Sequence, residues 1–181
     1  MSIPGVIERS RIPADDGTSM AKARDRSQEA LAHADGLYNL ARYLTGREQE
    51  AEDLVQETYT RAFGAIARLQ PDSNVKAWLY QILRNAHISQ WRRRRNDPLV
   101  PGLDAALAPV EADALRRVVA RDIEAALMTL SDEARMVILL DLEGFTEAEM
   151  ADIMDCATGT VKSRLHRARA ALRARLAEYG P

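Results

Sequence analysis

The chain has 181 residues and is 46% hydrophobic, which is enough for one or two small packed domains and excludes wholesale disorder. Its one cysteine, Cys156, excludes an intrachain disulfide and a multi-cysteine zinc site, and no apolar run is long enough to span a membrane. The formal net charge of −2 hides a segregation, because acids gather between Glu48 and Glu57 while cations gather at 92–95 and 162–175.

The N-terminal part of the chain has the pattern of a small helical domain over 23–95. Residues 1–22 contain prolines and glycines and have no apolar period, so we expect a flexible leader there. Gly46 is a natural C-cap, and Pro71 lies in a stretch of turn-forming residues. Apolar residues at helical spacing between these breaks predict three helices, at about 27–44, 47–67 and 75–95.

The C-terminal part is predicted to form a second helical domain over 111–181. Prolines and a glycine give 96–110 the composition of a linker. Helices are predicted at about 111–128 and 132–142, with Ser131 as the N-cap of the second. Because β-branched runs are scarce, the expected fold class is all-α, with two small helical domains joined by this linker.

The stretch 146–176 has the pattern of a helix-turn-helix. Thr146-Glu147-Ala148-Glu149 has the form of a capping box and opens a short helix that ends near Asp155. A second helix is predicted to start near Thr158. One of its faces carries Val161, Leu165, Ala168, Leu172 and Leu176, and its other side is polar and cationic. A helix of this kind fits the major groove of DNA.

Several motifs together resemble one protein family. Residues 51–58 (AEDLVQET) and 77–85 (AWLYQILRN), followed by the arginine run, resemble the first conserved domain of extracytoplasmic function (ECF) sigma factors, and 153–156 (IMDC) with 159–169 (GTVKSRLHRAR) resemble the second. The resemblance covers roughly 31–95 and 111–176. It implies a subunit that binds bacterial RNA polymerase core and directs it to promoters, without catalytic residues, cofactor or metal of its own.

The resemblance also implies three groups of site residues. Contact with core polymerase is expected from Asp53, Gln56 and Glu57. Contact with the −10 element, including a flipped base, is expected from Leu69, Lys76, Tyr80, Arg84, Asn85, Arg92 and Arg93. Contact with the −35 element is expected from Thr160, Lys162, Ser163, Arg164, His166 and Arg167.

Simpler interpretations stand beside these roles. The acids near Asp53 also fit a solvated helix face, and the arginine run also fits a solvated helix end or a phosphate-contacting patch. Trp78 fits core packing better than DNA contact, and Tyr80 fits a half-buried surface tyrosine equally well. Ala157 stands where the family often has serine or proline, so the cap of the last helix would have to come from Thr158 or from a DNA phosphate.

The expected partners are RNA polymerase core, promoter DNA and a cognate anti-sigma protein. The last is expected because the self-inhibiting segment of primary sigma factors has no counterpart here. We expect no small-molecule substrate, no membrane insertion and a cytoplasmic location. A stand-alone helix-turn-helix regulator is the nearest alternative, but it would not explain 51–58 or 77–85. An adaptor that mimics a sigma factor is another, and an enzyme is disfavoured because the histidines are scattered and no glycine-rich phosphate loop occurs.

Overall fold

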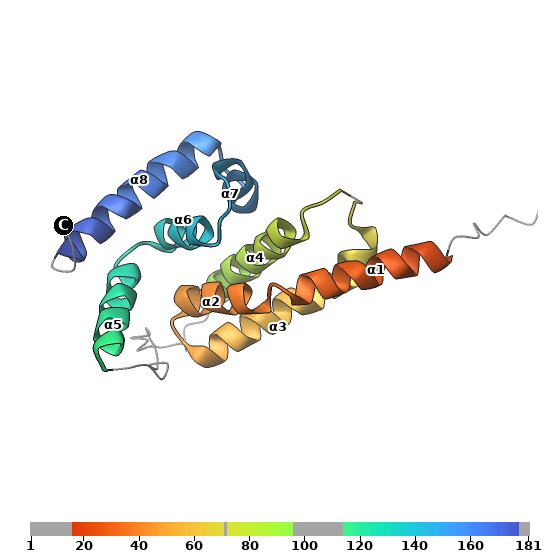
Figure 1. Cartoon of the computed structure of the whole chain (residues 1–181), viewed down its shortest axis with the longest axis horizontal. Coiled ribbons are helices and arrows are strands. Elements are labelled where there is room, and N and C mark those ends of the chain that lie inside the picture. Colours follow the sequence, from red (N-terminus) through yellow and green to blue (C-terminus); the bar gives the residue numbers. More distant parts are fainter. Residues whose placement is uncertain (1–15, 71, 96–113, 178–181) are drawn as a thin grey trace, which may run out of the picture.

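The computed structural model describes residues 16–70, 72–95 and 114–177, and these residues form helices and turns with no strand among them (Figure 1). The predicted all-α fold class is therefore confirmed. The expected linker, 96–110, lies outside the described residues. The elements are α1 (Asp16–Leu31), α2 (Ala34–Thr45), α3 (Glu48–Ala65), η1 (Ile66–Arg68), α4 (Val75–Arg95), α5 (Ala114–Met128), α6 (Asp132–Leu142), α7 (Glu147–Met154) and α8 (Thr158–Arg175).

The N-terminal helical group is built from α2, α3 and α4, with α1 packed against η1 and α4. Its core is lined by apolar residues that recur at helical spacing, namely Leu37, Leu40, Leu44, Ala51, Leu54, Ala62, Val75, Leu79, Leu83 and Ala86. Thr58 is fully buried in this core, and its hydroxyl donates to the Leu54 carbonyl at 2.7 Å, which satisfies the polar group inside the helix. Trp78 packs partly buried against the same core, as the core-packing interpretation predicts.

The start of the chain differs from the prediction in two ways. α1 begins at Asp16, so 16–22 of the expected leader is helical, and 1–15 lies outside the described residues. The single helix expected over 27–44 is broken between α1 and α2. At the break the Ala30 carbonyl accepts hydrogen bonds from Tyr59 Oη (3.0 Å) and from the His33 N–H (3.2 Å). Residues 31–33 include no glycine or proline that would predict a break. The contact from Tyr59 of α3 lies at this position instead.

The C-terminal helical group packs α5, α6 and α7 around α8, and its caps follow the sequence prediction. Ser131 accepts from the Ala134 N–H, and Thr146 and Glu149 form the predicted capping box. The turn between α7 and α8 passes through Asp155, whose left-handed φ of 48° is uncommon for a residue with a side chain. This group is the predicted helix-turn-helix extended by α5 and α6.

The two helical groups contact each other. α7 packs on α4, and α6 lies between α2 and α8 (Figure 1). Arg135 in α6 is 4% exposed and donates to the Tyr43 carbonyl of α2 at 2.9 Å. It also donates to the Leu127 and Leu130 carbonyls, at 3.0 and 2.9 Å, and so ties the turn before α6 to the N-terminal group.

Candidate nucleic-acid interface

α8 presents the polar face that the sequence predicts. Val161, Leu165 and Ala168 are buried against α6 and α7, at 0%, 5% and 2% exposure. The opposite side of the helix therefore faces solvent. Of the expected −35 residues, Lys162, Ser163, His166 and Arg167 are exposed, and Thr160 and Arg164 are intermediate.

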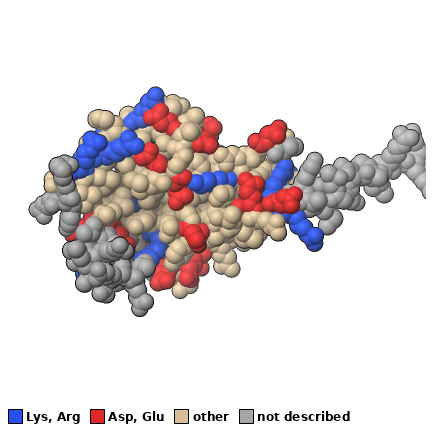
Figure 2. Space-filling view, in the orientation of Figure 1, with Lys and Arg blue, Asp and Glu red and all other residues tan. Residues whose placement is uncertain are grey.

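Cations of α8 form a visible cluster on one side of the molecule. Figure 2 shows Lys and Arg side chains gathered at the upper left, over α8. Lys162 lies 3.3 Å from Glu147 and Arg169 lies 2.6 Å from Asp141. Exposed ion pairs of this type contribute little, typically about 0–1 kcal/mol, so a phosphate can replace either acid.

The N-terminus of α8 carries no side-chain cap. Its N-cap residue, Ala157, has φ −66° and ψ 144° and makes no side-chain hydrogen bond to the helix. Thr158 follows inside the helix rather than capping it. Backbone N–H groups at the start of a helix bind anions, so this end of α8 is suited to a DNA phosphate.

The expected −10 residues on α4 fall into two sets. Asn85 and Arg92 are exposed, and Arg84 is half-buried and lies 3.4 Å from the Asn85 side-chain oxygen through Nη1. Arg84 and Arg92 line an open groove between α4 and the C-terminal group. Asn85 is exposed beside Arg84 and is accessible to a base or a phosphate.

The second set is covered by the C-terminal group, which corrects the expectation that Tyr80 lies at the surface. Tyr80 is 0% exposed, and its Oη donates to Glu143 Oε2 at 2.9 Å. The Phe145 ring packs edge-on against Tyr80, with centroids 4.9 Å apart. Lys76 Nζ donates to the Glu143 carbonyl at 2.6 Å and lies 3.5 Å from its carboxylate. Burial first, and then the hydrogen bond to Glu143, raise the pKa of Tyr80 above its ordinary value, so the hydroxyl remains a donor.

Two further expected −10 residues have structural contacts. Leu69 is half-buried at the end of η1, and its carbonyl accepts from Arg26 Nη1 at 2.6 Å. Arg93 is exposed, lies 3.5 Å from Glu57, and donates to the Ser89 carbonyl at 3.3 Å. Both residues therefore hold neighbouring segments together, and the Arg93 guanidinium remains open to solvent.

The expected polymerase-contacting residues lie on α3, where Asp53 and Gln56 are exposed. Glu57 instead bonds to neighbouring side chains. It forms a short ion pair with Arg61, accepts from Gln90 Nε2 at 2.8 Å and lies 3.5 Å from Arg93. Partial burial opposes ionisation of Glu57, but the Gln90 hydrogen bond and the two arginines outweigh it and lower its pKa. Glu57 therefore joins α3 to α4 as a stable carboxylate.

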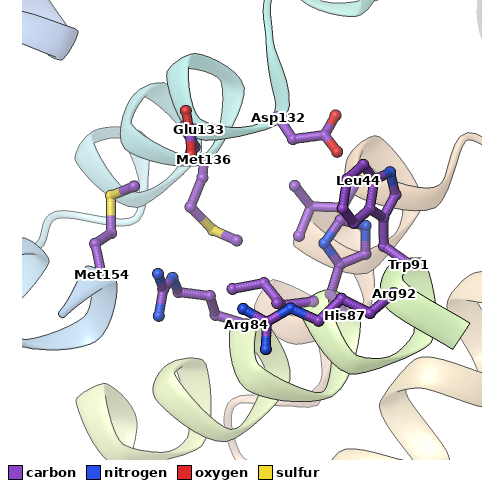
Figure 3. A pocket seen from close by; sticks show the side chains of 10 residues that line it. Leu44, Arg84, His87, Trp91, Arg92, Asp132, Glu133, Met136 and Met154 are labelled. Atoms are coloured by element: carbon purple, nitrogen blue, oxygen red, sulfur yellow. The ribbon is translucent and has the colours of Figure 1, made fainter. Parts of the chain in front are cut away.

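A groove of about 450 Å³ opens between the two helical groups beside the covered set (Figure 3). Arg84, His87, Trp91 and Arg92 line it from α4, and Asp132, Glu133 and Met136 line it from α6, with Leu44, Ile88 and Met154 completing the wall. Burial is the main cause that lowers the pKa of His87, so its imidazole is neutral in this wall at pH 7.

Sequence reasoning missed the residues that join the two groups. Arg135 could have been found, because a cation that begins the apolar run 136–140 needs a buried partner. Glu143 and Phe145 carried no such signal. Within the described part of the chain, no group of three or more His, Cys, Asp or Glu side chains could hold a metal ion, and no helix is long and apolar enough to cross a membrane.

Comparison with known proteins locates two families along the chain. The model of sigma-70 region 2 matches residues 30–96, and the model of sigma-70 region 4 matches residues 120–172. The chain is 37% identical over 162 residues to the ECF RNA polymerase sigma factor EcfG of Rhodopseudomonas palustris, covering 84% of this chain and 88% of that protein. It is 30% identical over 161 residues to the ECF RNA polymerase sigma factor SigW of Bacillus subtilis, covering 80% of this chain and 84% of that one.

Two solved structures are similar in fold to this chain. The sigma factor RpoE of Bartonella quintana, solved in complex with the anti-sigma factor NepR, matches with a TM-score of 0.76 and 35% identity, over 87% of this chain and 99% of that one. CnrH, solved in complex with the cytosolic domain of CnrY, matches with a TM-score of 0.66 and 26% identity, over 90% of this chain and 96% of that one.

Proposed function

Because the chain belongs to the ECF family of RNA polymerase sigma factors, we propose that its two helical groups divide promoter recognition between them. The protein is an alternative sigma factor that directs transcription initiation. We assign core binding and the −10 element to 23–95, and the −35 element to 111–181. The observation that carries the −35 part of this assignment is that α8 buries an apolar stripe and turns its polar face to solvent.

We assign −35 recognition to this face of α8. Arg167 is exposed, and its Nε donates only to the Ser163 carbonyl in the same helix, at 3.2 Å, which leaves the rest of the guanidinium for a base edge. A bidentate arginine–guanine contact contributes about 1–3 kcal/mol of discrimination. The uncapped N-terminus of α8 would take a phosphate and set the depth of the helix in the groove.

We assign −10 recognition to α4. The Asn85 amide both donates and accepts, which suits the edge of a base flipped out of the duplex. Arg84 beside it supplies a flat cation that stacks on a base or binds a phosphate. Arg92 and Arg93 lie on the exposed end of the same helix and would add sequence-independent affinity for the backbone.

We assign core-polymerase binding to Asp53 and Gln56 on α3. An exposed acid and an amide four-fifths of a turn apart suit a basic partner surface, where charge sets orientation and association rate. Glu57 contributes indirectly, because its contacts with Gln90 and Arg93 hold α3 against α4.

The proposed partners are RNA polymerase core, promoter DNA and an anti-sigma protein. Two of the matched sigma factors were solved with a bound partner, NepR and CnrY, which supports a partner of the anti-sigma class here. We propose that the chain has no enzymatic reaction of its own and that it acts in the cytoplasm, where RNA polymerase acts.

The division of labour is tested with two variants. Arg167→Ala should lower discrimination at the −35 element by about 1–3 kcal/mol and leave core binding unchanged. Asp53→Ala with Gln56→Ala should weaken core binding, and the holoenzyme that does assemble should discriminate between −35 elements as the unaltered one does. The measurements are co-purification with core polymerase and transcription from promoter fragments with intact or shuffled −35 segments.

Matched controls separate contact loss from unfolding. Gln28→Ala with Glu29→Ala removes one amide and one acid from exposed positions of α1, and Arg175→Ala removes an arginine from the far end of α8. Both controls should behave like the unaltered chain. Loss of both activities in both test variants, with a lowered melting temperature, would refute the assignment of separate surfaces.

A further inference from the structure

Two arginines at the end of α4 lie against two glutamates of α3. Arg94 Nη1 lies 2.5 Å from Glu50 Oε2, and Arg93 Nη2 lies 3.5 Å from Glu57 Oε1. The Glu57 carboxylate also accepts a hydrogen bond from Gln90 Nε2 at 2.8 Å, one turn earlier on α4. We call Glu50 and Glu57 the tethering glutamates, because each ties a cation of α4 to α3.

The packing of α3 on α4 sets these pairs (Figure 1). Glu50 and Glu57 are two turns apart on one face of α3, about 10 Å along its axis. Their side chains are only 16% and 26% exposed, whereas the Arg93 side chain is 65% exposed. The carboxylates are therefore held in place by their surroundings, while the arginine can still reach a ligand in solvent.

Glu57 carries a full negative charge at neutral pH. Partial burial would raise the pKa of Glu57, but the Gln90 hydrogen bond and the charges of Arg61 and Arg93 lower it on balance. The carboxylate therefore offsets the charge of the arginine beside it over the whole physiological pH range.

The tethering is selective on both helices. Arg92 is exposed, and no carboxylate of the described residues lies within ion-pair distance of it. Glu48 and Glu52 of α3 are exposed as well, and neither forms an ion pair within the part of the chain that the structure describes. Two particular acids of α3 thus neutralise two particular arginines of α4.

A carboxylate beside an arginine occupies the position that a DNA phosphate would take. The proposed function gives this end of α4 to the DNA backbone, where an arginine adds affinity for any sequence. We propose that the tethering glutamates are specificity-determining residues, which lower the affinity of the chain for non-promoter DNA by neutralising Arg93 and Arg94. This inference rests on the proposed function for the role of α4 and adds a role in selectivity for Glu50 and Glu57.

Lower sequence-independent affinity improves selection, because a genome offers about a million or more competing non-specific sites. Arg84 and Asn85, which we assign to base recognition, lie more than two turns earlier on α4, and in the described part of the chain neither is bonded to a tethering glutamate. Neutralisation at the end of α4 therefore weakens backbone binding and spares base contacts. An ion pair with an exposed arginine is weak, so a phosphate can still displace the carboxylate at a promoter.

The test uses the full chain with charges removed from α3 in two ways. Glu50→Gln with Glu57→Gln, the untethered variant, removes both tethering charges and nearly keeps the side-chain shape. Glu48→Gln with Glu52→Gln is the matched control, because it removes two charges from exposed positions of the same helix. The two variants have equal net charge, so a difference between them reports the local pairs rather than long-range attraction.

Fluorescence anisotropy measures the binding of a short labelled duplex of random sequence at about 50 to 200 mM salt. We expect the untethered variant to bind the duplex about tenfold more tightly than the control variant at the lower salt concentration. Each arginine released to a phosphate steepens the plot of log K against log salt by about 0.9, so its slope should be steeper by about 1–2. The gain in affinity should accordingly shrink as the salt concentration rises.

A second comparison assigns the gain to particular arginines. In a chain that carries Arg93→Gln with Arg94→Gln, the two tethering substitutions should increase duplex affinity no more than the two control substitutions do. A gain that persists without these arginines would overturn the assignment, because the glutamates would then act through Arg47 or Arg61, which they also contact.

Equal duplex affinities and equal salt slopes of the untethered and control variants would refute the inference. If circular dichroism shows that the untethered variant is unfolded, Glu50→Gln against Glu48→Gln decides alone, with an expected difference in slope of up to about 0.9. Failure of the proposed function has a different signature, because the unaltered chain with core polymerase would then start no transcripts, whatever the duplex affinities show.

Discussion

At the scale of single residues, several charged side chains in this protein form contacts between helices within the chain. Glu57 belongs to a motif expected to touch polymerase, yet its carboxylate is bonded to Arg61, Gln90 and Arg93. Arg135 is buried and donates to carbonyls at the end of α5, in the turn before α6 and in α2. Its guanidinium has five N–H donors in one plane, which is why one side chain can satisfy carbonyls from three segments.

Arg135→Met should lower the free energy of unfolding by on the order of 3 kcal/mol, because buried carbonyls lose their donors while the side-chain volume is nearly kept. Urea unfolding followed by circular dichroism measures the change. Arg121→Met, at an exposed position of α5, is the control and should change the free energy of unfolding by less than about 0.5 kcal/mol. Equal effects of the two substitutions would contradict the role given to Arg135.

At the scale of elements, the helices of the C-terminal group differ in how their N-termini are capped, although α2 and α3 also begin without a side-chain cap. α6 and α7 begin with side-chain caps from Ser131 and Thr146, whereas α8 begins at Ala157 without one. The backbone at Ala157 is extended in the same way as at the two capped positions. The missing cap is therefore a matter of side chain alone, and it leaves N–H donors open at the end of α8 proposed to meet a phosphate.

Ala157→Ser should stabilise the protein by about 1 kcal/mol, because the serine hydroxyl can accept a hydrogen bond from a free N–H of the first turn of α8. Thermal and urea unfolding measure this change. Ala170→Ser, at an exposed position inside α8, is the control and should be slightly destabilising. A serine at position 157 that stabilises no more than the serine at position 170 would show that this end of α8 already has its donors satisfied.

Helix ends that depend on nearby residues could be predicted from the sequence, and a helix end that depends on a distant residue could not. Helix ends set by local chemistry were predicted correctly, as at Gly46, Ser131 and Thr146, because caps act within a few residues. The break between α1 and α2 was missed because it is made by Tyr59, far along the chain. The exposed face of α8 was predicted correctly, because it lies opposite an apolar stripe that the sequence shows directly. The burial of Tyr80 was not predicted, because its partner Glu143 belongs to the other helical group.

At the scale of the whole molecule, the chain combines surfaces of opposite charge within a nearly neutral total of −2. Figure 2 shows cations gathered over α8 with acids beside them and further acids elsewhere on the same face, and two of the α8 cations, Lys162 and Arg169, pair with neighbouring acids. A nearly neutral protein gains little from long-range attraction to DNA, so tight promoter binding would depend on the charge and contacts of the polymerase. The contact between the two helical groups also limits DNA binding by the chain alone, because α7 packs on part of α4.

The central claim is that this protein supplies promoter selection to RNA polymerase core. The most direct measurement is transcription from a library of genomic fragments by core alone, by the chain alone and by the two together. We predict that only the mixture starts transcripts, and that it does so at a small, reproducible subset of fragments. Silence of the mixture on every fragment, with the chain binding a duplex operator tightly by itself, would contradict the account and identify a stand-alone regulator instead.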